Sequence, residues 1–114
     1  MPRHDSREMF QRLPFPFDGD VFPAALGAVI QRTVLDGSEP AREVTHTFDG
    51  SWLVSDGVND PNPPGASVAT HIWHAIKHNS SVRSLASMPP GHIAKREGPG
   101  CEWRIVILDE SEDG

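Results

Sequence analysis

The sequence predicts a single α+β domain, in which one main helix packs on an antiparallel sheet of about five strands. Two observations carry this prediction. Short apolar runs alternate in hydrophobicity and are separated by Gly- and Pro-rich turn signals, which is typical of antiparallel strands. The segment 67–78 instead spaces its apolar residues by three and four, as an amphipathic helix does. A chain of 114 residues has the length of one domain.

The first strand is expected over residues 28–35. This stretch is rich in β-branched side chains and leads into Asp36-Gly37, a turn signal. The wider region 22–35 also fits a helical face, so helix and strand both stay open for part of it.

The clearest hairpin lies around Asp49-Gly50. Residues 42–48 alternate between two faces, and Ser51 to Val54 return as the partner strand. Residues 55–65 follow as a loop, because their prolines remove backbone donors and disfavour helix.

The second half of the chain is predicted to hold the helices and the last strands. Ser67 can cap the main helix, 67–78, and a short helical extension follows over 81–87. The chain is extended over 92–97. The final strand, 102–108, is largely apolar on both faces, so we expect it at the centre of the sheet.

The ends of the chain lie outside this domain, which spans residues 21–108. Residues 1–20 form a proline-broken N-terminal arm, and we expect the phenylalanines of 13–17 to dock on the chain's own core. Residues 1–8 are expected to lack order, and 109–114 form an acidic tail.

The composition limits the kinds of partner. The formal net charge is −6 and the ten Lys and Arg residues form no stripe, which argues against nucleic acid. No apolar run is long enough to cross a membrane. The single cysteine and the absence of an apolar signal region indicate a reduced, cytoplasmic protein. A protein partner is the remaining expectation, and a homodimer is one form of it.

No catalytic residue is predicted, and an enzyme is the less favoured reading. Cys101 follows a turn and has no nucleophile context. His71, His74 and His78 would share one flank of the predicted helix, where imidazoles four residues apart could bind zinc. No third ligand or adjacent glutamate is evident, so no cofactor is expected and zinc is the alternative.

Five residues are candidates for a partner-binding surface. Trp73 points away from the apolar centre of its helix, whereas Trp52 and Trp103 are assigned to the core. The other candidates are polar: His92 and Arg96 on the extended segment, and Asp56 and Asp60 in the preceding loop. The spacing of the two aspartates does not match a calcium loop.

A run of landmarks gives the sequence a resemblance to known proteins. The run contains Val44-Thr45-His46, Asp49-Gly50-Ser51-Trp52, the segment 85–96 with Pro89-Pro90-Gly91, and the segment 99–103. With these landmarks, residues 28–107 resemble a family of small uncharacterised bacterial proteins, for which no activity is implied. The chain is more distantly similar to one class of immunity proteins found beside secreted bacterial toxins.

The function predicted from these observations is that of a non-enzymatic protein-binding module. The distant resemblance implies an immunity- or antitoxin-like inhibitor of a partner protein. The alternative is a small metal-binding protein or metal-dependent enzyme that uses the face of His71, His74 and His78.

Overall fold

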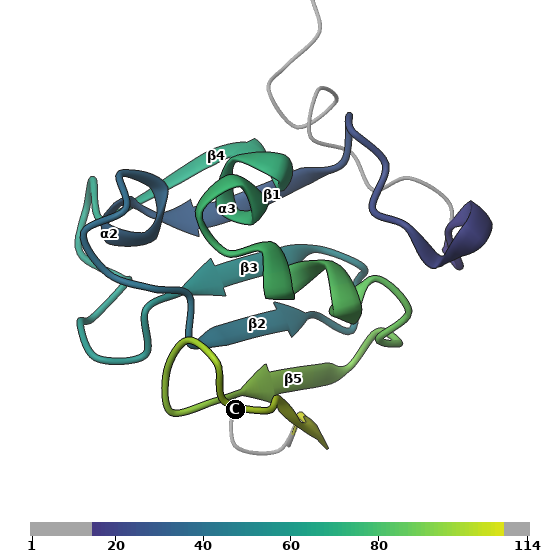
Figure 1. Cartoon of the computed structure of the whole chain (residues 1–114). Helices are drawn as coiled ribbons and strands as arrows, with labels where there is room; N and C mark the ends of the chain where they lie inside the picture. The colour runs from purple at the N-terminus through teal and green to yellow at the C-terminus, as the bar shows by residue number, and fades with distance from the viewer. Residues whose placement is uncertain (1–14, 109–114) are drawn as a thin grey trace, which may run out of the picture.

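The structure is a computed structural model that describes residues 15–108. Within this range, six strands form one sheet in the order β4-β1-β3-β2-β5-β6 (Figure 1). The strands are β1 Gly27–Gln31, β2 Glu43–His46, β3 Trp52–Ser55, β4 Ser67–His71, β5 His92–Lys95 and β6 Arg104–Ile107. The predicted α+β class is confirmed. The sheet is mixed rather than antiparallel throughout, because β1 and β3 run parallel.

The helices cover one face of the sheet. They are α2 Arg32–Leu35, α3 Trp73–His78 and the 3₁₀ helix η2 Ser80–Leu85, with a 3₁₀ turn η1 at Asp18–Asp20. Figure 1 shows α3 and η2 lying across the front of the central strands. The strand register brings one row of side chains under these helices: Val68, Ile30, Val54, Val44, Ala94 and Ile105. The four middle members of this row are buried and form the centre of the core.

The first strand is shorter than predicted. It ends at Gln31, and the chain then turns into α2 instead of continuing extended to residue 35. The turn is fixed by hydrogen bonds: the Arg32 N–H donates to the Ala66 carbonyl at 2.8 Å, and the Asp36 N–H donates to the Arg32 carbonyl at 2.9 Å. β-branched residues in a single turn of helix are tolerated because Val34 is packed in the core.

The predicted start of the main helix at Ser67 is wrong. Residues 67–71 form β4, which pairs antiparallel with the whole of β1, and the helix begins only at Trp73. The Ile72 N–H donates to the Leu26 carbonyl at 2.9 Å, where the chain leaves the sheet. Val68 therefore matched the helical spacing of Ile72 by coincidence, since one lies in a strand and the other in the following turn.

The position of the last strand is also corrected. β6 lies at the edge of the sheet, not at its centre, and all four of its residues are exposed. The apolar character of its two faces is therefore not explained by burial among residues 15–108.

Several other predictions are confirmed. The hairpin of β2 and β3 pairs Val44 with Val54, the loop 55–65 follows it, and a short helix lies close to the predicted 81–87.

Phe15 and Phe17 pack on the chain's own core, as expected of the arm, and Trp52 is buried beside them. Trp103 is only partly buried against the core. The predictions for 1–14 and 109–114 lie outside the described residues.

Candidate functional site

The second face of the sheet carries a row of side chains, apolar except for Thr45, that the helices do not cover. Its members lie in register across all six strands: Ala69, Val29, Leu53, Thr45, Ile93 and Val106. Val29 and Leu53 are each 38% exposed and Val106 is 50% exposed. α2, α3 and η2 all pack on the opposite face, so within residues 15–108 no helix covers this one. We call this set the outer row.

The outer row ends at an open backbone edge. The Arg96 N–H donates to the carbonyl of Arg42, which directly precedes β2, and the Leu108 N–H donates to the Gly91 carbonyl. Together with the strand register, these bonds show which residues of β5 and β6 direct their backbone N–H and C=O groups toward each other. Arg104 and Val106 turn their backbone groups toward β5. The N–H and C=O groups of Ile105 and Ile107 point away from the sheet, where a further strand would pair.

Two basic side chains lie beside the end of the outer row. Lys95 and Arg104 are directly opposite each other in the β5–β6 register, and both are exposed. Neither forms an ion pair with a carboxylate of the described chain. Glu43, opposite Lys95 on β2, instead accepts a hydrogen bond from Ser55 at 3.5 Å. Lys95 and Arg104 carry like charges directly opposite each other, which is unfavourable, and Glu43 offsets only one of the two, so the β6 end of this row keeps a net positive charge.

Arg96, one of the predicted site residues, lies at a different place from this outer face. It follows β5, and its side chain is only 6% exposed. Its Nε–H donates to the Ala41 carbonyl at 2.9 Å, its Nη1 bonds the Ser81 hydroxyl, and its guanidinium lies over the Trp103 ring. Burial lowers the pKa of Arg96, although guanidinium stays charged in proteins.

A groove of about 440 Å³ opens beside Arg96. Its other lining residues come from the α2–β2 connection, the α3–η2 junction and the β5–β6 loop: Gly37, Glu39, Pro40, His78, Asn79, Ser80, Ser81, Pro99 and Gly100. The Asn79 side chain is fixed at the floor, since its Oδ1 accepts from the Ala41 N–H at 3.0 Å and its Nδ2 donates to the Ala75 carbonyl at 3.1 Å. The groove is therefore built from well-anchored side chains.

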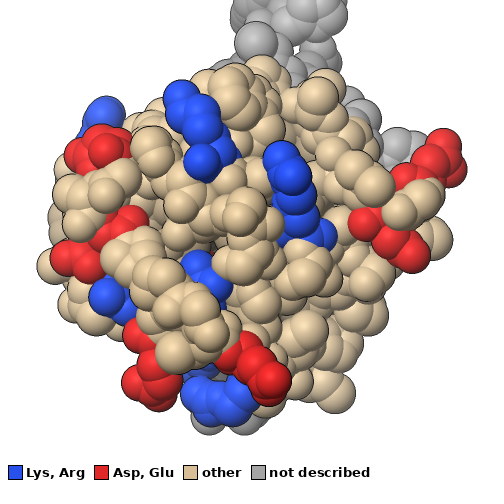
Figure 2. Space-filling view, in the orientation of Figure 1, with Lys and Arg blue, Asp and Glu red and all other residues tan. Residues whose placement is uncertain are grey.

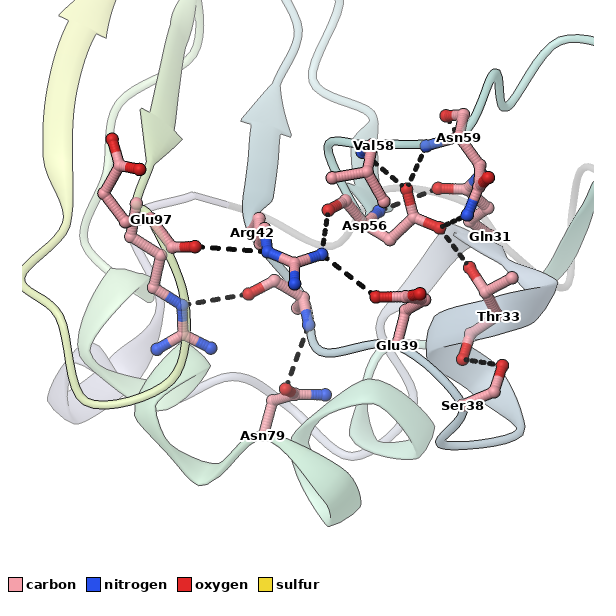
Figure 3. A network of polar contacts seen from close by, with 12 residues as sticks. Gln31, Thr33, Ser38, Glu39, Arg42, Asp56, Val58, Asn59, Asn79 and Glu97 are labelled. Carbon is pink, nitrogen blue, oxygen red and sulfur yellow. Dashed lines mark hydrogen bonds and ion pairs between the residues drawn. The ribbon is translucent and has the colours of Figure 1, made fainter.

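Asp56 was predicted at a partner surface, but the structure places it inside the protein. Its side chain is fully buried, and its two carboxylate oxygens accept hydrogen bonds from Val58 N–H, Asn59 N–H, Asn59 Nδ2 and the Thr33 hydroxyl (Figure 3). Burial alone would raise its pKa, but these hydrogen bonds lower it to about 2. This carboxylate holds the loop after β3 and cannot contact a partner.

The polar network around Asp56 extends to the neighbouring segments (Figure 3). Gln31 accepts from the Asp56 N–H at 2.7 Å, and Arg42 Nη1 contacts both the Asp56 carbonyl at 2.9 Å and Glu39 at 3.1 Å. Asp60 lies further along the exposed loop, where it accepts from the Asn62 N–H and side chain at 3.0 Å. Its contacts are those of a turn.

Trp73 and His92 do not come together with Arg96. Trp73 is 43% exposed on α3, with His74 stacked on it at 4.2 Å between ring centroids and Lys77 Nζ 5.4 Å from its ring centroid. His92 lies on β5 opposite Ile107, and its Nδ1 contacts the Pro90 carbonyl at 3.2 Å. The five predicted partner residues therefore do not form one surface.

The three histidines are divided between two elements. His71 ends β4, whereas His74 and His78 are on α3. The rings of His71 and His74 stack with 6.4 Å between centroids, and His78 lies against Gly37. Among residues 15–108, no three His, Cys, Asp or Glu side chains are placed to hold a metal ion together. The prediction that the three histidines share one flank of a single helix is wrong, because His71 lies at the end of β4.

On the helix-covered face, Lys and Arg side chains are scattered rather than gathered in one stripe, and acidic side chains lie toward the rim (Figure 2). Cys101 is a free, exposed thiol. None of the helices within residues 15–108 has the length and apolar character needed to cross a membrane.

Comparison with models of protein families, with curated proteins and with solved structures found no match to this chain. The geometry is therefore the basis for assigning a function.

Sequence reasoning missed the outer row and the edge of β6. The signal was present in residues 103–108, whose two faces are both largely apolar, with Arg104 as the exception. Such a pattern fits a central strand or an edge strand whose faces remain available, and only the strand order distinguishes the two.

Proposed function

We propose that this protein is a non-enzymatic protein-binding module whose partner adds an extended strand to β6. One observation carries the proposal: the outer row runs unbroken to Val106, at an edge where the backbone groups of Ile105 and Ile107 are directed outward. Main-chain hydrogen bonds would supply affinity, and side chains alternating along the added strand would supply specificity. An immunity- or antitoxin-like inhibitor in the cytoplasm would act in this way, by stoichiometric binding.

The side chains of the edge indicate the chemistry of the partner strand. A strand paired with β6 presents every second residue to the outer face. A residue of the partner strand beside Val106 would contact an apolar side chain. A residue two positions along the partner strand would lie beside Arg104, whose other neighbour is Lys95 on β5. The partner strand is therefore apolar at the first position and acidic at the second, which relieves the repulsion between the two basic groups.

The test is site-specific photo-crosslinking in cells of the source organism. A photoreactive amino acid is placed at Val106 in one variant and at Val58, an exposed residue of the 55–65 loop, in the control. The cross-linked peptides are then sequenced by mass spectrometry. The proposal predicts one partner protein, cross-linked from Val106 but not from Val58, through a segment in which apolar and acidic residues alternate.

Three outcomes would overturn the proposal. The same proteins captured from both positions would mean that the contact is not specific to β6. A cross-link only to a second copy of this chain would replace the proposed partner with a homodimer. No cross-link from Val106, under conditions in which the variant is folded and expressed, would remove the β6 edge as a binding site.

A further inference from the structure

A buried cation without a carboxylate partner is the feature that carries this inference. Arg96 is nine-tenths buried, and its contacts are the Ala41 carbonyl, the Ser81 hydroxyl and the Trp103 ring. Among residues 15–108, no carboxylate forms an ion pair with it. An arginine cannot escape the cost of burial by losing its proton, so its charge needs compensation from its surroundings. Neutral hydrogen-bond acceptors and one aromatic ring supply only part of it.

Arg96 lines the groove of about 440 Å³, a volume within the range of small-molecule sites. A guanidinium has five N–H donors in a planar fork, and the protein's acceptors engage only two of its nitrogens. Further groups that can donate hydrogen bonds line the groove, namely the hydroxyls of Ser80 and Ser81 and the imidazole of His78. Trp103 stacks on the guanidinium, and its indole N–H donates to the Ser81 carbonyl at 3.2 Å. These contacts hold the fork in one orientation.

Glu39 is the acidic side chain in the lining of the groove, and it would oppose a bound anion. Its carboxylate is drawn to Arg42, with 3.1 Å between Oε1 and Nη1. The charge of Glu39 is therefore partly compensated by Arg42, whereas Arg96 has no carboxylate partner among residues 15–108.

We propose that the groove beside Arg96 is a binding site for one small oxyanion, a carboxylate or a phosphate group, which the guanidinium holds through its free donors. The site takes a free metabolite or a group on a larger small molecule, and it is separate from the β6 edge. It stands whether or not that edge binds a partner.

The test is an NMR titration of the ¹⁵N-labelled full chain at constant ionic strength. Inorganic phosphate and succinate are added in separate arms, so that the two sources of oxyanion are distinguished. The reporters are the Arg96 Nε–H and the Trp103 indole N–H. We expect saturable shifts of both resonances in at least one arm, and the arm that saturates identifies the class of oxyanion.

Two matched variants locate the site. Ser80→Glu places a negative charge in the groove at an exposed residue, and it should weaken the anion about tenfold or more. Ser87→Glu adds the same charge at an exposed residue outside the lining and should leave the affinity unchanged within about twofold. Arg96→Gln, if it folds, should abolish saturation, while Arg83→Gln on the exposed side of η2 should not.

The proposal is overturned if neither anion gives saturable shifts at Arg96 and Trp103. It is also overturned if Ser80→Glu and Ser87→Glu titrate like the unaltered protein. In either case Arg96 serves only to tie the end of β5 to the α2–β2 connection through Ala41 and to η2 through Ser81. Because neither result involves β6, failure here is distinct from failure of the proposed protein-binding function.

Discussion

Val106 of β6 lies directly opposite Ile93 of β5 and continues the outer row to the edge of the sheet, where half of the Val106 side chain is exposed. A side chain at the centre of a sheet would be covered by strands on both sides. Val106 is covered on one side only, and the backbone of its two neighbours in the strand is directed outward. Within residues 15–108, β6 is one of the two edge strands of the sheet, and β4 is the other.

Truncating Val106 should have little effect on stability. Val106→Ala is expected to change the free energy of unfolding by less than about 0.5 kcal/mol, because the side chain is half exposed. Val44→Ala, the same change at a fully buried position of β2, should cost about 2 to 3 kcal/mol through lost burial and a cavity. Urea denaturation measures both values. Equal costs would mean that β6 is covered in the isolated chain.

Gly91 should be the glycine most sensitive to substitution by alanine. It has a φ of +82°, and an added Cβ would lie 2.7 Å from Cε1 of Phe48. Gly65 has the same φ but no atom within 4 Å of the added Cβ. Gly65→Ala should therefore cost about 1 kcal/mol for backbone strain alone. Gly91→Ala should cost about 1 to 3 kcal/mol more, because the Phe48 ring must move. Thermal unfolding of the two variants measures the difference that is due to the Phe48 contact. An equal loss of stability in both variants would contradict the prediction.

Asp56 should contribute to stability through its hydrogen bonds. Asp56→Asn replaces one acceptor oxygen by an amide that faces the Asn59 amide and the Thr33 hydroxyl, and we expect a loss of about 1 to 3 kcal/mol. Asp60→Asn, in the exposed turn, should cost less than about 0.5 kcal/mol. Chemical denaturation at neutral pH compares them.

The lowered pKa of Asp56 also predicts a pH dependence. Its pKa is about 2 in the folded protein against an ordinary value of 3.8. Its contribution is therefore fully present above pH 3.8 and is lost as the pH falls from there toward about 2. Asp56→Asn should remove this part of the acid sensitivity, and an unchanged acid limb would contradict the assignment.

His46 should make the protein less stable at mildly acidic pH. It is buried, stacked on Trp52 with 3.9 Å between ring centroids, and its Nδ1 lies 2.8 Å from the Met88 carbonyl. Burial lowers its pKa from the ordinary 6.5, the Met88 carbonyl raises it, and the charge of His92 lowers it again. The unfolded chain therefore takes up this proton at a higher pH than the folded chain does.

The sign of the effect follows from that difference. The contribution of His46 is fully present above about pH 6.5 and is lost as the pH falls from there toward the lowered pKa of the folded protein. Unfolding in urea at a series of pH values between about 7.5 and 5 measures the loss. His46→Gln should flatten the profile, and His92→Gln should reduce its slope, because His92 is the charged group that acts on His46. A profile unaffected by His46→Gln would show that another group is responsible.

The sequence predicted the fold class, the β2–β3 hairpin and the packing of Phe17 and Trp52, because turn signals and alternation are local properties. The sequence did not predict that residues 67–71 form a strand. Val68 and Thr70 suit a strand, but the spacing of Val68 and Ile72 also suits a helix, and pairing with β1 decides between them.

The candidate site was predicted less well, because strand order is not a local property. Arg96 was predicted as a polar anchor on a partner-binding surface, whereas the structure places it in the lining of a groove, with Asp56 buried and Trp73 on a separate element. The apolar pattern of residues 103–108 fits an edge strand as well as a central strand. The sequence alone therefore could not predict the position of β6 in the sheet.

Hydrogen exchange of individual backbone amides in β6 tests the central claim most directly. In the isolated chain, the amides of Ile105 and Ile107 should exchange fast while that of Val106, which faces β5, is protected. In the complex with the partner cross-linked from Val106, the account predicts that Ile105 and Ile107 become protected by at least about tenfold. Unchanged exchange at both amides in a saturated complex would contradict it, because no strand would then have paired with β6.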